Sequence, residues 1–166
     1  TVIISPTGVI GPYDYTPSFM GQALIMMARS KLPALLTGGF NWVDVRDVTQ
    51  GAIAAAQKAD GGQKYILSGQ WVSIAGIALA VRESTGSKVP SLIVPAKFVS
   101  WIAPIIEIYY RLTKQRLLFT SMSMDTIGGY RNISHDKATH DLGYKPRPFR
   151  RTIVDTLAWF KQNGYI

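Results

Sequence analysis

Tyr110 and Lys114 have the spacing in this sequence that most resembles a catalytic pair. Four positions apart on a helix, the ammonium would lie beside the phenol and lower its pKa for proton transfer. The same spacing is common by chance, and the pair lies at the end of a long apolar helix predicted over residues 96–113. Spacing alone therefore assigns Tyr110 no role.

Metal-binding and nucleophilic groups are sparse. His135 and His140 are five positions apart, so they face different sides of a helix and cannot chelate one metal ion together. No glycine-x-serine-x-glycine segment supplies a nucleophile elbow. Without cysteine the chain has no thiolate chemistry and no disulfide. We expect no metal site, and the lack of cysteine favours a reducing compartment such as the cytoplasm.

Two acidic residues, Asp44 and Asp47, flank a predicted strand-to-helix junction. Helix capping and ion pairing with Arg46 explain both carboxylates without a catalytic role. Asp47 stands three positions before Gln50, which predicts a capping box and a helix over residues 48–58. Arg46 could instead orient an anionic substrate, but we favour its pairing with Asp44 or Asp47.

Two short segments near the start could contact a ligand. The glycine pair in residues 8–11 is followed by Pro12 where a phosphate-binding turn would open a helix, so it cannot present helix amides to phosphate. Pro6 and Thr7 follow a buried strand predicted over residues 1–4, at the end where open α/β sheets bind ligands. They either contact a ligand or merely end the strand, and both interpretations stay open.

Two buried strands, residues 1–4 and 64–67, each adjoin a helix, which is typical of a parallel sheet. We expect these strands to be parallel neighbours, joined by a right-handed crossover that includes helix 48–58. Other helices are predicted from their caps and stop signals: Ser18 opens one, Ser73 and Gly86 bound a second, Ser134 and Gly143 bound a third, and residues 150–164 form the last.

The length and composition are typical of a single globular domain. With 166 residues and 47% hydrophobic content, the chain can bury one sizeable core. The net charge of +8 is concentrated in residues 91–166. We interpret the two dense basic runs as a solvated helix end and a loop, and expect no nucleic-acid binding. Prolines and charges break the most apolar stretch, residues 89–110, which argues against a transmembrane helix.

Three segments, in order, resemble the extended short-chain dehydrogenases/reductases. "IISPTGVIGP" is similar to the family's strand and loop ending in glycine-proline, with Ser5 where the family often has asparagine. "NWVDVRDVTQGAIAA" is similar to its valine-aspartate stretch before an alanine-rich helix, and "YRNISHDKATHDLGYKPRPFRRTIVDTLAWFKQNGY" to its ending. The likeness spans Thr1 to Tyr165 and is closest to dihydroflavonol-4-reductase-like and sugar-epimerase-like members.

This resemblance implies an α/β fold. Residues 1–72 would be the last parallel strands of a Rossmann-type sheet with an inserted loop region, and residues 73–166 a small, mostly helical substrate-binding subdomain. The intact enzyme would use NAD or NADP to transfer hydride between nicotinamide and a secondary alcohol or ketone. The family's glycine-rich turn and Tyr-x-x-x-Lys pair precede the strand that opens this chain. We therefore expect a C-terminal part that is inactive alone and binds no dinucleotide tightly, with Tyr110 in packing or pocket lining.

The resemblance also implies which residues contact ligands. Pro6 and Thr7 would meet the nicotinamide end of the cofactor. Pro12, Arg46 and Tyr109 are the expected contacts to a small-molecule substrate, and no residue of this chain is assigned to catalysis. The alternative function is a non-catalytic interaction module that keeps the substrate-domain fold. The substrate, the choice of NAD or NADP and the distinction between reductase and epimerase stay open.

The predicted opening strand has consequences for association. If strands that precede Thr1 are missing, this strand has an unpaired backbone edge, and Val2, Ile3 and Ile4 lack covering helices. We expect a homodimer through residues 1–10 or marginal stability of the isolated chain.

Overall fold

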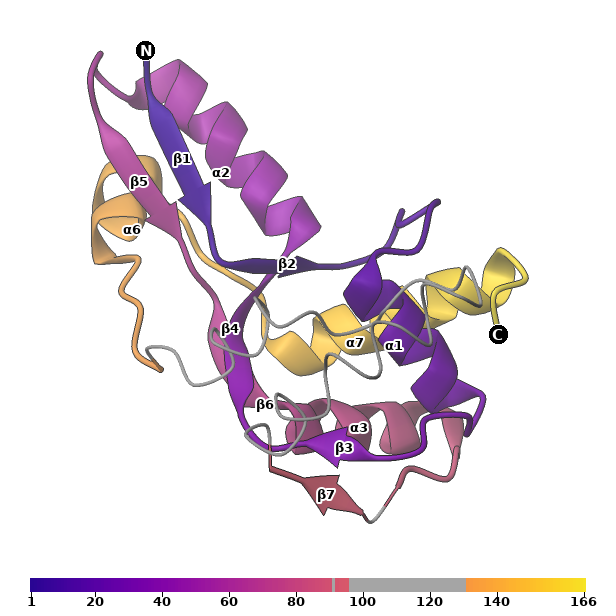
Figure 1. Ribbon diagram of the computed structural model, residues 1–166. Helices are drawn as coiled ribbons and strands as arrows, with labels where there is room; N and C mark the ends of the chain where they lie inside the picture. The colour runs from indigo at the N-terminus through magenta and orange to yellow at the C-terminus, as the bar shows by residue number, and fades with distance from the viewer. Residues whose placement is uncertain (91, 96–130) are drawn as a thin grey trace, which may run out of the picture.

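The computed structural model describes residues 1–90, 92–95 and 131–166. Strand β1 (Ile3–Pro6) lies parallel to β5 (Lys64–Leu67) (Figure 1). The predicted parallel pairing is confirmed, although the first strand begins at Ile3 rather than at Thr1.

Two further groups of strands follow along the chain. β2 (Gly8–Ile10) pairs in parallel with β4 (Gly39–Asp44), and β4 pairs antiparallel with β6 (Gln70–Ser73). A short parallel pair joins β3 (Leu35–Leu36) to β7 (Ile93–Val94). The described strands are thus mainly parallel, in agreement with the predicted α/β class.

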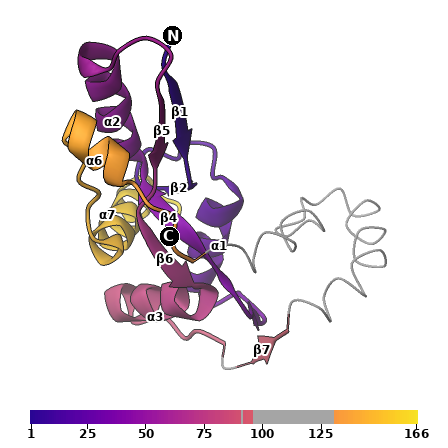
Figure 2. The ribbon, with the colours of Figure 1, turned by 90° about the vertical axis from the view of Figure 1, so that its left-hand side faces the viewer.

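Helices cover one face of the β1–β5 pair. α2 (Val45–Lys58) and α6 (Asp136–Leu142) lie on the same side of these strands (Figure 2). Their small and apolar side chains meet the inward side chains of β5 and the end of β4. This smaller core consists of Val43, Ala55, Tyr65, Leu67, Ala138, Leu142 and Tyr144.

The opposite face of β1 and β5 is bare. Ile3 and Ile66 are each 47% exposed there. Val2 and Ile4, which the sequence places without cover, are instead half-buried against the smaller core. The alternation of side chains along a strand explains the difference, because only every second residue of β1 faces away from α2.

Three helices form the larger core beside β4 and β6. α1 (Phe19–Ala28), α3 (Ile74–Thr85) and α7 (Phe149–Gln162) pack against one another. α3 and α7 each turn an apolar stripe toward this core, and its members are all buried: Ile74, Ile77, Ala78, Val81, Ile153, Leu157 and Phe160.

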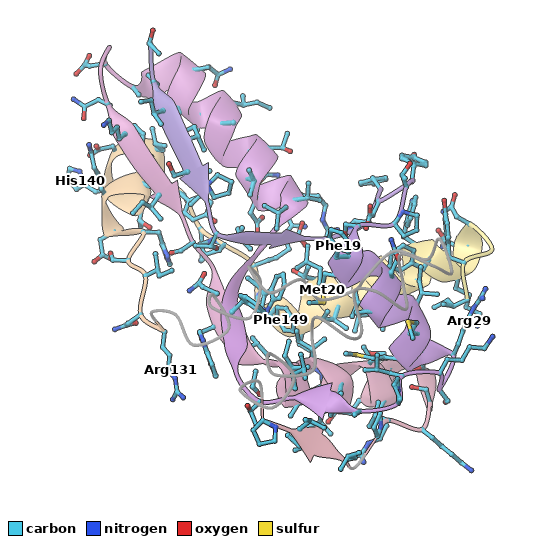
Figure 3. The ribbon with its side chains drawn as sticks, in the orientation of Figure 1. Phe19, Met20, Arg29, Arg131, His140 and Phe149 are labelled. Carbon is cyan, nitrogen blue, oxygen red and sulfur yellow. The ribbon has the colours of Figure 1, made fainter. Side chains whose placement is uncertain are left out.

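Charged and apolar side chains separate as expected between surface and core. Phe149, at the first turn of α7, lies inside the molecule, whereas Arg29, Arg131 and His140 extend outward (Figure 3).

Most helix ends follow the predicted local signals. The hydroxyl oxygens of Ser18 and Ser73 accept backbone N–H groups three residues on, which caps α1 and α3. Gly86 and Gly143 end α3 and α6, each with φ of 71° in the left-handed region that favours glycine.

The start of α2 is a correction to the sequence prediction. Asp44, rather than Asp47, is the N-cap, and its carboxylate accepts the Arg46 backbone N–H at 2.8 Å. The helix predicted over residues 48–58 therefore begins three residues earlier, at Val45. Either aspartate could cap a helix that begins at the following residue. Only Asp44 has the extended backbone of a cap, whereas Asp47 lies inside the first turn of α2.

Ser134 is a second, smaller correction, because the N-cap of α6 is His135. The helix predicted over residues 96–113, with Tyr109 and the Tyr110–Lys114 pair, lies outside the described residues. Within the described ranges, no helix has the length and apolar character needed to cross a membrane.

Gly69 generates a prediction about stability. A Cβ at this position would collide with the carbonyl oxygen of Trp42 in β4. We predict that Gly69→Ala lowers the free energy of unfolding by about 3 kcal/mol, because rigid backbone cannot move aside. Urea denaturation measures the change. Gly61→Ala is the matched control, since a Cβ there meets open space, and equal stabilities of the two variants would contradict the close approach at Gly69.

The bare strand face generates a prediction about self-association. We predict that the chain dimerises through residues 1–10 and that Ile3→Lys combined with Ile66→Lys reduces the dimer fraction, because charge on an exposed strand face opposes pairing. Sedimentation velocity over a concentration series measures this fraction. Leu79→Lys, at an exposed position of α3, should leave it unchanged. A purely monomeric unaltered chain would rule the dimer out.

Candidate functional site

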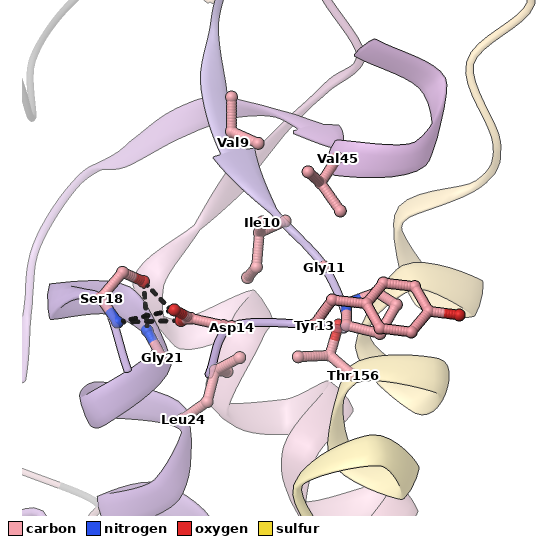
Figure 4. Close-up of a pocket in the computed structure, with 11 residues that line it drawn as sticks. Val9, Ile10, Gly11, Tyr13, Asp14, Ser18, Gly21, Leu24, Val45 and Thr156 are labelled. Carbon is pink, nitrogen blue, oxygen red and sulfur yellow. Dashed lines mark hydrogen bonds between the residues drawn. The ribbon is translucent and has the colours of Figure 1, made fainter. Parts of the chain in front are cut away.

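A cavity of about 300 Å³ opens at the carboxyl end of β2 (Figure 4). This volume is at the lower end of the range for small-molecule pockets. A second cavity of about 410 Å³ lies between the ends of α3 and α7, and no strand residue lines it. The first cavity is lined by Val9, Ile10, Gly11, Pro12, Tyr13, Asp14, Ser18, Gly21, Leu24, Val45 and Thr156.

The turn after β2 brings the chain tightly against α2. A Cβ at Gly11 would lie 2.6 Å from Cγ1 of Val45, so this position requires glycine. Pro12 follows and is buried. The Gly11–Pro12 corner therefore sets the distance between two walls of the cavity.

The loop after this corner is fastened to the start of α1. The Asp14 carboxylate accepts the Ser18 backbone N–H at 2.9 Å and the Ser18 hydroxyl at 2.8 Å. Gly21 in the first turn of α1 leaves room for this carboxylate, because a Cβ there would collide with it. Asp14 thus faces the cavity with both its oxygens already accepting hydrogen bonds.

Tyr13 has an unusual backbone conformation at the rim of the cavity. Its φ is 71°, a left-handed value that is uncommon for a bulky residue, and its side chain is 60% exposed. The ring lies edge-on to Trp159 with centroids 6.2 Å apart. Tyr165 stacks on Trp159 and donates its hydroxyl to the Tyr15 carbonyl at 2.7 Å, which ties the same loop to the end of α7.

Charged side chains join α2 to α7 and to the chain before it. Arg46 donates to both carboxylate oxygens of Asp44, at 2.9 and 2.7 Å, and to Asp155 at 2.8 Å. Arg147 donates its backbone N–H and its side-chain Nε–H to Asp47, each at 2.8 Å. Asp47 is therefore paired with Arg147 rather than with Arg46.

The Asp44 carboxylate is fully buried. Burial alone would raise its pKa, but hydrogen bonds from Arg46 and Thr152 outweigh this effect and hold the pKa below the ordinary value of 3.8. The same pairing raises the pKa of Arg46. Because Val45 and Thr156 lie on the two helices that this cluster joins, it fixes two walls of the cavity relative to each other.

The predicted site residues do not all lie at this cavity. Pro12 lines the cavity, whereas Pro6, Thr7 and Arg46 do not. The Thr7 hydroxyl donates to the Asn41 side-chain oxygen at 2.9 Å, just beyond the carboxyl end of β1. Cofactor contact by Pro6 and Thr7 stays a prediction, and so does substrate contact by Pro12, Arg46 and Tyr109.

Sequence reasoning missed most of the cavity. Tyr13, Asp14 and Thr156 carry no motif, and Thr156 joins the others because α7 packs against α1 and β4. The one available signal was the position of Tyr13 and Asp14 directly after the glycine-proline corner.

The two histidines lie in separate hydrogen-bonded settings. His135 Nδ1 is 3.0 Å from the Ser68 hydroxyl, and His140 Nδ1 is 2.7 Å from the Asp141 carboxylate. Neither lines the cavity.

Asp44 generates a prediction about pH. Because its pKa is lowered on folding, the ionised carboxylate stabilises the fold above the unfolded pKa, and this contribution is lost as the pH falls below about 4. We predict that Asp44→Asn lowers the free energy of unfolding by about 3 kcal/mol near neutral pH, since Arg46 loses a buried partner. The deficit should shrink in acid.

Urea denaturation of both proteins across this pH range is the measurement. Glu83→Gln is the control, because Glu83 forms an exposed pair with Arg150 and should contribute less than about 1 kcal/mol. A deficit for Asp44→Asn that is constant with pH would contradict the lowered pKa.

No protein-family model matches the chain, but curated relatives do. It is 27% identical to sterol demethylase protein B of Methylococcus capsulatus over 99% of this chain and 51% of that protein. It is 28% identical to a Synechocystis protein named after dihydroflavonol 4-reductase, over 99% of this chain and 49% of that protein. The chain thus spans about half the length of these relatives.

Solved structures are also similar to this chain over about half of their length. The crystal structure of gox2253 is 30% identical, with a TM-score of 0.80 over 99% of this chain and 50% of that chain. A nucleoside-diphosphate-sugar epimerase from Pseudomonas aeruginosa is 21% identical, with a TM-score of 0.74 over 99% of this chain and 49% of that chain. The second likeness concerns the fold alone.

Other neighbours of low identity were solved with dinucleotides: a UDP-glucuronic acid 4-epimerase from Bacillus cereus with NAD, at 15% identity, and RMD from Pseudomonas aeruginosa with NADPH, at 16%. A third curated relative, at 29% identity over 75% of this chain and 35% of that protein, is short-chain dehydrogenase/reductase family 42E member 1 of Xenopus laevis. Together with the three ordered sequence motifs and the parallel strands, these likenesses show that the chain is similar to part of proteins of the short-chain dehydrogenase/reductase type, over a third to a half of their length.

Proposed function

We propose that the chain is the C-terminal, substrate-binding part of an NAD(P)-dependent reductase or epimerase that acts on a secondary alcohol or ketone. Residues 1–72 would end the dinucleotide-binding sheet, and residues 73–166 would form the substrate-binding subdomain. The observation that carries the proposal is the cavity at the carboxyl end of β2. Open α/β sheets bind their ligands outside the carboxyl ends of their strands.

The described residues do not fit the pyrophosphate end of a dinucleotide. The glycine pair in residues 8–11 forms β2 and its following corner, and the next helix begins only at Phe19. Helix N-terminal amides, which usually bind pyrophosphate, are therefore not presented by this turn. In the intact protein we propose that Pro6 and Thr7 border the nicotinamide, which supplies hydride transfer when bound.

The work of this chain is then to bind and orient the substrate. The cavity walls would exclude water from one side of the reacting alcohol or ketone, and Pro12 contributes directly to them. Substrate contact by Arg46 and Tyr109 belongs to the same proposal. One relative is named for dihydroflavonol reduction, and that name favours a reductase over an epimerase.

A non-catalytic interaction module is the second candidate. The observation that favours it is the bare face around Ile3 and Ile66, which a partner or a second copy would cover. The two candidates differ in whether an intact protein that contains this chain turns over substrate.

The test uses the longer protein that we propose contains this chain. We expect NAD(P)H-dependent reduction of a ketone or interconversion of an alcohol by that protein. Val9→Phe, which narrows the cavity from an exposed wall position, should lower kcat/KM by about tenfold or more through misplacement of the substrate. Ile53→Phe, at an exposed position of α2 that does not line the cavity, is the matched control.

Calorimetry on the 166-residue chain completes the test. NADH and NADPH should show no micromolar affinity for it, because the pyrophosphate site is missing from the described turn. Absence of any turnover in the longer protein would favour the interaction module. Micromolar dinucleotide binding by this chain alone would contradict the proposal that this chain binds substrate and lacks the pyrophosphate site.

A further inference from the structure

The walls of the cavity at β2 are mostly apolar. Val9, Ile10, Pro12, Leu24 and Val45 surround its interior from three different elements and the corner after β2. Burial of apolar ligand surface against such walls is favourable at roughly 25 cal/mol per Å². The body of a ligand held here is therefore expected to be apolar.

Apart from the Tyr13 hydroxyl at the rim, the polar side chains that line the cavity already form hydrogen bonds within the protein. The Thr156 hydroxyl donates to the Thr152 carbonyl at 2.6 Å, and Asp14 accepts from the backbone and hydroxyl of Ser18. Among the described residues that line the cavity there is no lysine, arginine or histidine. Asp14, a carboxylate, is the charged member of this lining.

The two arginines of the neighbouring ion cluster, Arg46 and Arg147, add no unpaired positive charge near the cavity. Arg46 is held by Asp44 and Asp155, and Arg147 by Asp47. Recognition of a diphosphate normally needs unpaired cationic donors or free helix amides. A nucleotide sugar would instead bring its negative charges toward Asp14 without compensation, which is unfavourable.

Tyr13 adds a flat surface at the rim. In Figure 4, Tyr13 and Ser18 lie on opposite sides of the cavity. Trp159 lies edge-on to the rings of both Tyr13 and Tyr15. Within the described part of the chain, the Tyr13 hydroxyl has no hydrogen-bond partner. Tyr13 thus combines an uncommon left-handed backbone with a largely exposed residue, and such backbone conformations cluster at ligand-binding sites.

We propose that this cavity binds a neutral, flat and largely apolar alcohol or ketone, that Tyr13 stacks on its ring, and that nucleotide sugars are excluded. The inference deepens the proposed function and rests on it. The small volume agrees with this class, since about 300 Å³ holds a few fused rings more readily than a nucleotide joined to a sugar.

Ligand titration of the 166-residue chain tests the substrate class. The probes are 1-tetralone, a neutral bicyclic ketone, and UDP-glucose, and protein-observed NMR reports which residues shift. We expect 1-tetralone to bind with shifts at β2 and the loop over residues 11–18, and UDP-glucose not to bind up to millimolar concentration.

Substitutions at the rim test the role of Tyr13. Tyr13→Asn removes the ring while keeping a residue that tolerates a left-handed backbone, and should weaken 1-tetralone binding by about threefold to tenfold. Tyr13→Phe keeps the ring and should bind nearly as well as the unaltered chain. Tyr15→Ala is the matched control, because the Tyr15 ring also lies edge-on to Trp159 but does not line the cavity.

The outcomes separate this inference from the proposed function. Binding of UDP-glucose at the cavity, or no binding of 1-tetralone, would overturn the substrate class while the longer protein could still turn over with NAD(P)H. Equal weakening by Tyr13→Asn and Tyr15→Ala would overturn direct stacking by Tyr13. Failure of the proposed function is measured differently, as absence of turnover in the longer protein, whatever binds to this chain.

Discussion

The buried Asp44 carboxylate is the constraint on which the described site depends. It caps α2, binds the guanidinium of Arg46 through both oxygens and accepts a hydrogen bond from Thr152 of α7. A buried charge without these partners would be strongly destabilising. Because the partners come from two helices, satisfying one carboxylate also sets the positions of α2 and α7 at the end of β4. The cavity lies between the elements that this requirement brings together.

Strand β4 separates the two cores, and its last residue belongs to the ion cluster beside the cavity. Trp42 faces the larger core with α1, α3 and α7, whereas Val43 faces the smaller core with α2 and α6. This follows from the period of two along a strand. The next residue, Asp44, ends β4 between the two cores, so the ion cluster lies where they meet, whereas the cavity borders the larger core through Ile10 and Leu24.

Local signals were sufficient for much of the fold but not for the site. Ser18, Ser73 and Gly86 identify helix ends because capping depends only on neighbouring residues. The choice between Asp44 and Asp47 needed the partner Arg147, which is 100 positions away from Asp47 and invisible to local pattern. The left-handed Tyr13 was equally beyond prediction, since no local sequence signal marks it and its ring contact is with Trp159 of α7, far away in the sequence.

The charge of the whole chain is a poor guide to what its cavity accepts. A net charge of +8 attracts anions to the surface in general. The arginines beside the cavity, however, are neutralised by buried or half-buried carboxylates, and the lining itself contributes Asp14. Screening weakens the distant surface charges over about 10 Å, whereas groups that touch a ligand act at full strength. In the proposed binding, local pairing rather than net charge would therefore decide which ligands the cavity accepts.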